Sequence, residues 1–401
     1  MRIPLSYLAS LAALALLSGA ARAGAQTSDD LFAEAGVQDL QLLVNSTDLA
    51  LLRQDYTANT YYPADIEYRG VRVRNVGIRS RGLGSRSATK LGLRVDMNRF
   101  SSGQRFFGET AVVLDNLWQD ATLVRERLAM AMFERAGIAA PREVFVRLFV
   151  NGSYEGLYAL TEEVNKQFLE RTGAAGDVLF EFKWVTEYRA EDLGADPAAY
   201  VPLFEARTHE SDAVPVLYGP LLELLHDAAP LEGAAWRAYV ESRLDLRQLL
   251  SYVAVESFLA DPDGLLGYAG MNNFYLHRPE AGAVHRVIPW DKDNAFADPA
   301  SSIWLRTGEN ALVTRALGFS DLREHYLQAV TSCAALAAED GWLANRLEAL
   351  LTLADAPAIQ DLRKPHTEPE RAAATAALRE FVATRPAQVA GEVASPGAIV
   401  R

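Results

Sequence analysis

The chain has 401 residues, 50% hydrophobic and 23% charged, with 39 basic against 52 acidic side chains and a net charge of −13. This composition is typical of a globular protein and excludes a largely disordered chain, and the acidic balance argues against general binding to nucleic acid or anionic lipid. The single cysteine, Cys333, excludes intramolecular disulfides and cysteine-rich zinc sites, and its apolar surroundings predict a small buried residue.

The first residues have the pattern of an export signal. Arg2 precedes an apolar run at residues 5–17, which is shorter than a membrane span, and an Ala-x-Ala cleavage site follows at 21–23. We therefore expect residues 1–23 to be a signal peptide and 24–37 a linker, with an uncleaved anchor as the alternative. No cysteine follows the run, so no lipid attachment is expected there, and no later stretch is long enough to span a membrane. The predicted location is secreted or periplasmic.

Residues 38–185 are predicted to form a β-rich unit. Apolar and polar residues alternate in three stretches, at 40–44, 71–78 and 89–97. In the third stretch, Lys90 and Arg94 fall on the polar face. A loop rich in glycine and serine, residues 79–87, joins the second stretch to the third.

A helix and a hairpin complete this unit. Asp120 is a candidate N-cap for a helix with an apolar stripe, and Gly137 is its candidate C-cap. Asn151 and Gly152 lie between two apolar stretches and are the residue pair of a type I′ turn, so they predict a β-hairpin. The hairpin is expected to end at Glu162, before a short helix.

Residues 186–385 are predicted to form a mostly helical second unit, and residues 386–401 a C-terminal tail. Helical patterns occur near 213–227 and 232–245, from 246, and beyond 305. Within this unit, strands at 274–277 and 284–289 with a turn between them predict another hairpin.

Oxygen ligands gather at the mouth of this second hairpin. In an antiparallel pair, the residue before the first strand and the residue after the second lie at the same end. Asn273 is therefore expected beside Asp291, with Asp293 close by, and Asp263 enters the same mouth from the preceding helix. Amide and carboxylate oxygens, without cysteine or a close histidine partner, suit Mg²⁺, Mn²⁺ or Ca²⁺.

This set of residues fits phosphoryl transfer, which needs a cation on the phosphates, a carboxylate to orient or deprotonate the acceptor hydroxyl, and a phosphate-binding lysine. Asn273 and Asp291 would hold the metal, with Asp263 as the base. Lys90 would bind the phosphates, and Glu162 would pair with its amine.

The nucleotide is expected to meet the glycine-rich loop. Gly82, Gly84 and Ser85 offer backbone N–H groups to phosphate. Trp290, directly before Asp291, would border a base or sugar, with a packing role as the alternative.

The combination resembles the CotH kinase family. The matching segments are residues 76–82 with Ser85, Lys90, Asp120 with Arg125, residues 150–158 with Glu162, residues 273–276 and residues 288–293. The resemblance implies an α+β, atypical protein-kinase-like, two-lobed fold with a β-rich N-lobe and a mostly helical C-lobe. It also implies an enzyme that uses ATP with Mg²⁺ or Mn²⁺ to phosphorylate a serine or threonine hydroxyl of a secreted or surface protein.

The resemblance assigns three sets of residues: catalytic Lys90, Glu162 and Asp263; nucleotide-binding Arg79, Gly82, Gly84, Ser85 and Trp290; and metal-binding Asn273, Asp291 and Asp293. One departure concerns the catalytic Asp. The family's Asp-Gly pair lies nearer to the Asn than in this chain, where Asp263 and Asn273 are ten positions apart. Either the loop between them is longer, or Asp261 takes the role.

Two other functions remain open from the sequence. A degenerate kinase-fold module, acting as a coat, wall or surface binding protein, would fit the export signal and the altered loop. A metal-dependent hydrolase would use the acidic cluster with a bound water, although there is no histidine-rich ligand set. An ordinary cytoplasmic protein kinase is disfavoured because no His-Arg-Asp or Asp-Phe-Gly triplet occurs. The expected partners are a nucleotide and a protein substrate, not nucleic acid.

Overall fold

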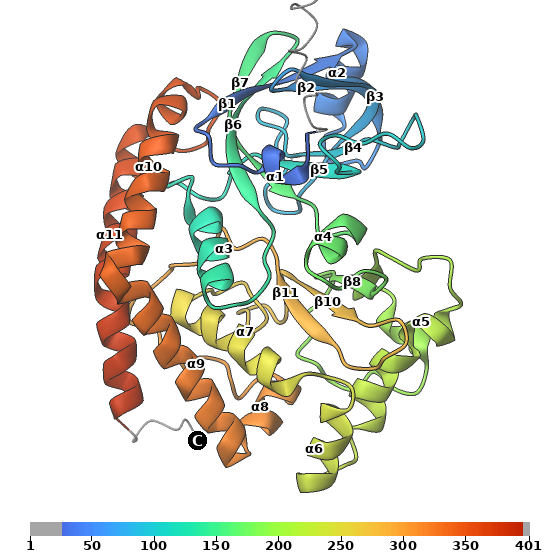
Figure 1. The fold of residues 1–401 in the computed structure, drawn as a ribbon, viewed down its shortest axis with the longest axis vertical. Coiled ribbons are helices and arrows are strands. Elements are labelled where there is room, and N and C mark those ends of the chain that lie inside the picture. The colour runs from blue at the N-terminus through green and yellow to red at the C-terminus, as the bar shows by residue number, and fades with distance from the viewer. Residues whose placement is uncertain (1–25, 396–401) are drawn as a thin grey trace, which may run out of the picture.

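The computed structural model describes residues 26–395, so the predicted signal peptide lies outside the described residues. The chain forms a mixed α/β structure with a closed seven-stranded barrel at one end and a four-stranded sheet with most of the helices beyond it (Figure 1). Within residues 26–395, no helix combines the length and apolar character needed to cross a membrane.

The barrel closes in the order β1-β2-β3-β4-β5-β7-β6, with β6 parallel to β1. Its strands are β1 (Gln38–Val44), β2 (Tyr62–Tyr68), β3 (Val71–Ser80), β4 (Leu93–Asp96), β5 (Ala111–Asp115), β6 (Glu143–Val150) and β7 (Ser153–Glu162). Asn151 and Gly152 have φ of 51° and 79°, so they form the predicted tight turn. β4 begins only at Leu93, so the strand expected from residue 89 is shorter than predicted.

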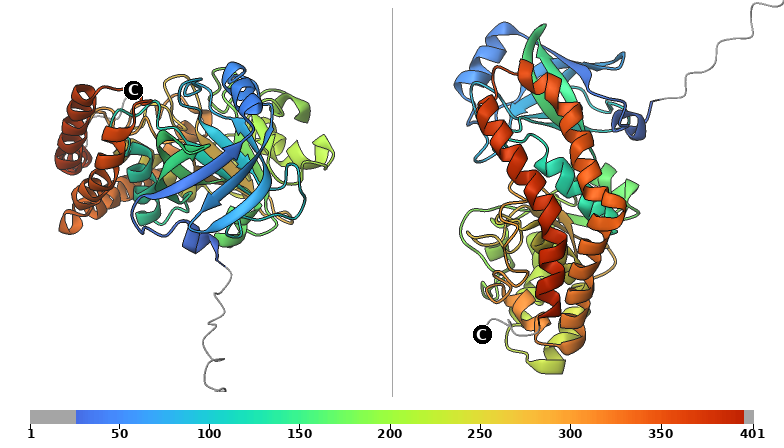
Figure 2. Two further views of the ribbon diagram at one scale, coloured as in Figure 1. Left: turned by 90° about the horizontal axis from the view of Figure 1, so that it is seen from above. Right: turned by 90° about the vertical axis from the view of Figure 1, so that its left-hand side faces the viewer.

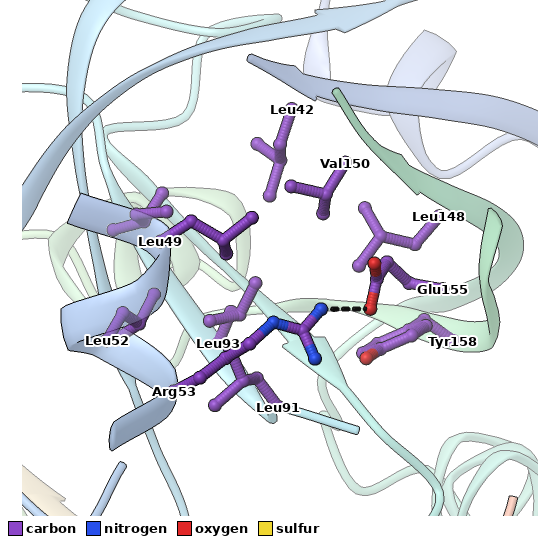
Figure 3. Close-up of a pocket in the computed structure, with 11 residues that line it drawn as sticks. Leu42, Leu49, Leu52, Arg53, Leu91, Leu93, Leu148, Val150, Glu155 and Tyr158 are labelled. Atoms are coloured by element: carbon purple, nitrogen blue, oxygen red, sulfur yellow. Dashed lines mark hydrogen bonds and ion pairs between the residues drawn. The ribbon is translucent and has the colours of Figure 1, made fainter. Parts of the chain in front are cut away.

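Alternating apolar residues of the strands fill the barrel. They leave a cavity of about 10 Å³, lined mainly by leucine and valine and closed on one side by the Arg53–Glu155 ion pair (Figure 3). A space of this size holds at most one water molecule. The barrel interior is therefore a packed core and has no room for a nucleotide.

Four short helices precede, interrupt or follow the barrel strands in the sequence. They are α1 (Ser28–Leu31), α2 (Ser46–Gln54), α3 (Arg125–Arg135) and α4 (Lys166–Arg171). α1 falls in the segment expected to be a linker. Asp120 accepts hydrogen bonds from the backbone N–H groups of Thr122 and Arg125, at 2.7 and 2.8 Å. It thus satisfies the first N–H of α3 from five residues upstream, which is close to the predicted capping role.

The four-stranded sheet is antiparallel in the order β11-β10-β8-β9. Its strands are β8 (Val178–Phe182), β9 (Phe204–Ala206), β10 (Phe274–Arg278) and β11 (Arg286–Pro289). Phe180 and Phe274 on one face join the large hydrophobic core, whereas Tyr275 and Ile288 on the other face pack in a small cluster with Val113 of β5. We call this small cluster the junction cluster, because it joins the sheet to the barrel.

β8 precedes residue 185, the expected boundary between the two units, yet it pairs with β10. The sheet therefore recruits chain from the segment assigned to the β-rich unit. Because β8 and β10 lie far apart in the chain, no local pattern of the sequence indicated their pairing.

The remaining helices form the rest of the large core. They are η1 (Pro197–Tyr200), α5 (Val214–Leu222), the π-helix η2 (Glu223–Asp227), α6 (Gly233–Glu241), α7 (Leu246–Leu259), α8 (Ala311–Leu317), α9 (Ser320–Ala338), η3 (Glu339–Gly341), α10 (Trp342–Gln360) and α11 (Glu368–Ala394). Cys333 is buried in α9 as predicted, and burial raises the pKa of its thiol to about 12.

α9, α10 and α11 run side by side along one flank, and α10 reaches the barrel strands β6 and β7 (Figures 1 and 2). α11 continues through Pro386, where a tail was expected to begin. The buried guanidinium of Arg385 explains this continuation, because it donates hydrogen bonds to the backbone oxygens of Phe258 and Ser301 at 2.9 and 2.6 Å. These bonds anchor the last turns of the helix on the core.

Candidate functional site

The mouth of the β10–β11 hairpin brings Asn273 and Asp291 together, as the sequence predicted. Phe274 pairs with Pro289, and the N–H of Trp290 donates to the oxygen of Asn273 at 3.3 Å. Both Asn273 and Asp291 have left-handed backbones, with φ of 58° and 51°. Asn and Asp adopt this conformation more readily than most residues, and such positions often occur at functional sites.

Asp263 lies against this mouth. The Asn273 side-chain amide donates to Asp263 Oδ2 and to its backbone oxygen, both at 3.1 Å, and the Asn272 amide donates to Oδ1 at 3.2 Å. Residues 264–272, which separate Asp263 from Asn273 in the chain, form a compact loop. Its two ends meet, since the N–H of Asn272 donates to the oxygen of Gly264 at 3.1 Å. The longer spacing in the sequence therefore leaves Asp263 beside Asn273.

Asp261, the alternative catalytic Asp, has a structural role. The ammonium of Lys292 lies 2.6 Å from Glu256 and 3.1 Å from Asp261, and these three side chains are almost entirely buried. Glu256 also accepts the N–H of Leu265 at 2.9 Å. The geometry thus favours Asp263, which lies half-buried at the mouth, over Asp261.

Acidic side chains at the mouth repel each other. Burial, together with nearby Asp115, raises the pKa of Asp291 to about 6 against the opposing effect of Arg81. Burial and Asp291 also raise the pKa of Asp293 well above its usual value. A cation at this position would relieve the repulsion, so the electrostatics of the mouth suit a positively charged ligand.

The donor set fits a cation that arrives with a phosphate ligand. Among residues 26–395, no three His, Cys, Asp or Glu side chains are grouped closely enough to hold a metal by themselves. Mg²⁺, however, is commonly bound by one or two carboxylates, with phosphate oxygens and waters completing its shell. Asn273 and Asp291, supported by Asp293, match that requirement.

Arg81, which the sequence reasoning missed, is the cation that most lowers the pKa of Asp291. Its guanidinium lies 4.8 Å from the centre of the Trp290 ring. Burial opposes its charge, but Asp291 raises the pKa of Arg81 above its usual value. Trp290 is only 5% exposed and meets Tyr275 edge-on at 5.5 Å. The indole therefore packs against Tyr275 and supports Arg81, which is the packing role that the sequence left as the alternative.

The glycine-rich loop is an ordered turn between β3 and β4. Gly82 has φ of 107°, and a Cβ there would lie 2.4 Å from Ser85 Oγ, so the turn requires glycine. Arg86 donates to the oxygen of Gly82 at 2.6 Å, and Asn116 donates to the oxygen of Ser85 at 2.9 Å. Gly84 is exposed at the tip. The loop is thus held from both sides with its tip open to solvent.

Arg79 is committed to anchoring this region. It donates to the Tyr61 hydroxyl and to Asn59 Oδ1, both at 3.2 Å. Both partners lie just before β2, so the Arg79 guanidinium braces the barrel wall.

Lys90 and Glu162 do not pair, and the predicted ion pair is wrong. Lys90 is fully buried in the loop before β4 and lies 2.7 Å from Asp361, which directly follows α10. Glu162 binds two other cations, Arg142 at 2.9 Å and Arg171 at 2.7 Å. Both predicted catalytic residues therefore hold the structure together.

A different arginine–glutamate pair joins the barrel strand β4 to the end of β7. Arg94 on β4 makes a two-pronged contact with Glu163, at 2.7 and 3.0 Å, and Arg207 donates to the same carboxylate at 2.9 Å. Burial opposes the charge of Arg94, but Glu163 raises its pKa above the usual value. The sequence signal was present, because Arg94 shares a polar face with Lys90, and Glu163 directly follows Glu162.

Comparison with known proteins matches these features to one family. A sequence model described as "CotH kinase protein" matches residues 78–388. A curated relative, "Inner spore coat protein H" of Bacillus subtilis (strain 168), is 23% identical over 299 residues, covering 71% of this chain and 78% of the relative.

Two solved structures resemble the chain distantly. The proinflammatory kinase CtkA of Helicobacter pylori has a TM-score of 0.33 at 7% identity, covering 75% of this chain and 92% of CtkA. A complex of HipA, HipB and operator DNA from Shewanella oneidensis MR-1 has a TM-score of 0.35 at 11% identity, covering 88% of this chain and 73% of the matched chain.

Proposed function

The chain belongs to the CotH kinase protein family, and we propose that it is a metal-dependent kinase that transfers the γ-phosphate of ATP to a serine or threonine hydroxyl of a protein. The convergence of Asp263, Asn273 and Asp291 at one hairpin mouth carries this proposal. Phosphoryl transfer requires this combination of a carboxylate for the acceptor and oxygen ligands for a cation.

Asp263 is assigned the role of orienting the acceptor hydroxyl. The amides of Asn272 and Asn273 fix its carboxylate, so one orientation is held before a substrate arrives. Burial raises the pKa of Asp263, which favours acceptance of the proton that leaves the hydroxyl. Asn273 and Asp291, supported by Asp293, would hold Mg²⁺ or Mn²⁺, which supplies charge neutralisation on the phosphates when it is bound.

The nucleotide phosphates are assigned to cations from the barrel. Arg81 lies beside the hairpin mouth, with its guanidinium over the Trp290 ring. Arg94 is held by Glu163 and by Asp96 at 2.8 Å, so phosphate would meet only its remaining N–H. The open tip around Gly84 would cover the phosphates from the barrel side. In this arrangement the barrel serves as the N-lobe, and the sheet with its helices serves as the C-lobe of a kinase-like fold.

The proposed acceptor is a secreted or surface protein. The predicted signal peptide supports export, and the relative's name, inner spore coat protein H, supports an extracellular or surface setting. The net charge of −13 supports a protein rather than a nucleic acid as the partner.

Transfer of radiolabel from γ-³²P-ATP to casein, with Mg²⁺ or Mn²⁺, tests the proposal. We expect labelling by the wild-type chain and by Asp212→Asn, a control at an exposed carboxylate. Asp263→Asn is expected to reduce transfer by roughly 10²- to 10⁴-fold with nucleotide binding kept. Asp291→Asn is expected to remove metal-dependent nucleotide binding.

Absence of labelling together with absence of nucleotide binding would contradict the kinase proposal. That result would favour the non-catalytic surface module, in which the same fold serves as a scaffold. Release of phosphate from ATP without labelled protein would instead favour a hydrolase.

A further inference from the structure

A group of exposed apolar side chains lies on two loops next to Asp263. Trp184 and Val185 follow β8 and are 40% and 56% exposed, and Tyr268, in the loop after Asp263, is 64% exposed. We call these three residues the aromatic platform. Large apolar side chains are costly to leave in water, so exposed ones gathered on two adjoining loops commonly mark an interaction surface.

The two loops of the aromatic platform are fixed to each other. The Trp184 indole N–H donates to the oxygen of Ala269 at 2.8 Å, and the N–H of Met271 donates to the oxygen of Tyr188 at 2.8 Å. A Cβ on Gly270 would lie 2.7 Å from the N of Tyr188, so the loops approach as closely as the backbone permits. The platform is thus a preformed surface, which reduces the entropic cost of binding.

The aromatic platform is attached directly to the proposed catalytic carboxylate. The N–H of Tyr268 donates to the oxygen of Pro262 at 2.8 Å, one residue before Asp263. The same loop returns to Asn272, whose amide holds the Asp263 carboxylate. The loop that carries Tyr268 is therefore joined at both ends to the segment that holds the group assigned to the acceptor hydroxyl.

Charge distinguishes the acceptor side from the nucleotide side. Arg189, beneath the platform loop, is paired with both Glu187 and Glu309, at 2.9 and 2.8 Å. These two carboxylates are 63% and 48% exposed, and together with Arg189 they carry a net charge of about −1. The proposed phosphate-binding arginines Arg81 and Arg94, in contrast, come from the barrel. The rim of the platform is therefore net acidic and complementary to basic side chains.

From these observations we propose that the aromatic platform docks the acceptor polypeptide, as an extended segment that carries an apolar residue and basic residues beside the phosphorylated hydroxyl. This inference rests on the proposed kinase function and adds the class of substrate. The apolar residue would pack on Trp184 and Tyr268, and the basic residues would meet Glu187 and Glu309.

Two serine peptides of equal length test the proposal, one with leucine and arginine near the serine and the other with alanine and glutamate. For the leucine–arginine peptide, Tyr268→Ala and Trp184→Ala are each expected to raise KM by about tenfold, with KM for ATP unchanged. Tyr268→Phe should retain wild-type KM because the ring is kept. Ile359→Ala, a control that removes a 55% exposed side chain from α10, should have no effect.

Three results would overturn the docking proposal. They are an unchanged peptide KM in both alanine variants, an equal change of KM for the two peptides, or a raised KM for ATP in the alanine variants. The last of these would assign the platform to the nucleotide base. Fluorescence anisotropy of the labelled leucine–arginine peptide separates docking from catalysis. If the wild-type chain transfers no phosphate and binds no nucleotide, the kinase proposal fails, whereas peptide binding that is lost in Tyr268→Ala and kept in Ile359→Ala would still support the platform.

Discussion

Lys90 and Asp361 form a fully buried ion pair at 2.7 Å, although 271 positions separate them in the chain. Lys90 also donates to the oxygen of Leu157 at 2.9 Å, and Asp361 accepts the N–H of Leu157 at 3.1 Å. The pair therefore ties the loop before β4 and strand β7 to the end of α10. It makes the lysine a connection between the barrel and the C-terminal helices.

Removal of Lys90 is expected to destabilise the fold. Lys90→Ala leaves the Asp361 carboxylate buried without its partner, which costs about 3–5 kcal/mol in comparable cases. Denaturant unfolding measures this loss, and Lys183→Ala, at a 41% exposed lysine, is the control. If Lys90→Ala instead left stability unchanged and abolished nucleotide binding, Lys90 would be the phosphate-binding lysine that the sequence suggested.

Gly156 is expected to tolerate no side chain, because Asp361 occupies the space beside it. Gly156 has φ of 130°, and a Cβ there would lie 2.4 Å from Asp361 Oδ2. Gly156→Ala should therefore destabilise the protein by about 2–4 kcal/mol, through strain and displacement of the ion pair.

Gly152→Ala separates these two causes in the same unfolding measurement. Gly152 has φ of 79° but no atom within 4 Å of the added Cβ, so only the backbone cost of about 1 kcal/mol is expected. Equal losses in the two variants would show that Asp361 does not restrict position 156.

The sequence predicted those parts of the fold and site that depend on local pattern. Alternation and the Asn151–Gly152 pair located the β6–β7 hairpin, and antiparallel geometry placed Asn273 beside Asp291. The family assignment was also predicted and is confirmed. These inferences succeeded because each uses neighbours in the chain or the two ends of one hairpin.

The ion-pair partners could not be predicted in the same way. Lys90 and Glu162 have the residue types of a kinase pair, but Lys90 turns into the structure toward Asp361 and Glu162 turns toward Arg142. The partner of Lys90 depends on the packing of α10 against the barrel, and the second partner of Glu162, Arg171, comes from α4. No local pattern encodes either contact. The structure instead contains an ion pair between Arg94, four positions after Lys90, and Glu163, one position after Glu162.

Arg94 is expected to require its guanidinium and not only its charge. Arg94→Lys keeps the positive charge but cannot make the two-pronged contact with Glu163. If this arginine holds nucleotide phosphate, KM for ATP should rise by about tenfold, with a smaller change in KM for the peptide. Arg99→Lys, at an exposed arginine in the same part of the barrel, is the control. An unchanged KM for ATP would confine Arg94 to a structural role.

Buried glutamates should give the protein an unusual dependence of stability on pH. Glu143, at the start of β6, is 7% exposed, and neither of its carboxylate oxygens has a hydrogen-bond partner among the described residues. Burial raises the pKa of Glu143 to about 8, against the opposing effect of Arg127. Burial likewise raises the pKa of Glu109 to about 7.

A raised pKa means that the folded protein binds more protons than the unfolded chain between the two pKa values. Stability must then fall as pH rises through this window, from about 4.5 to about 8, because ionisation of the buried carboxyl opposes folding. For wild type, we expect the free energy of unfolding to drop by about 1–3 kcal/mol between pH 5 and pH 8. Urea denaturation at the two pH values measures this drop.

Glu143→Gln identifies the group responsible, because a neutral amide of similar shape has no proton to lose. The variant should lose less stability than wild type between pH 5 and pH 8, and the gain should appear mainly at the higher pH. Glu280→Gln, at an exposed glutamate in the β10–β11 turn, should keep the wild-type dependence. A wild-type stability that rises across this range, or an unchanged slope in Glu143→Gln, would show that Glu143 is already ionised in the folded protein.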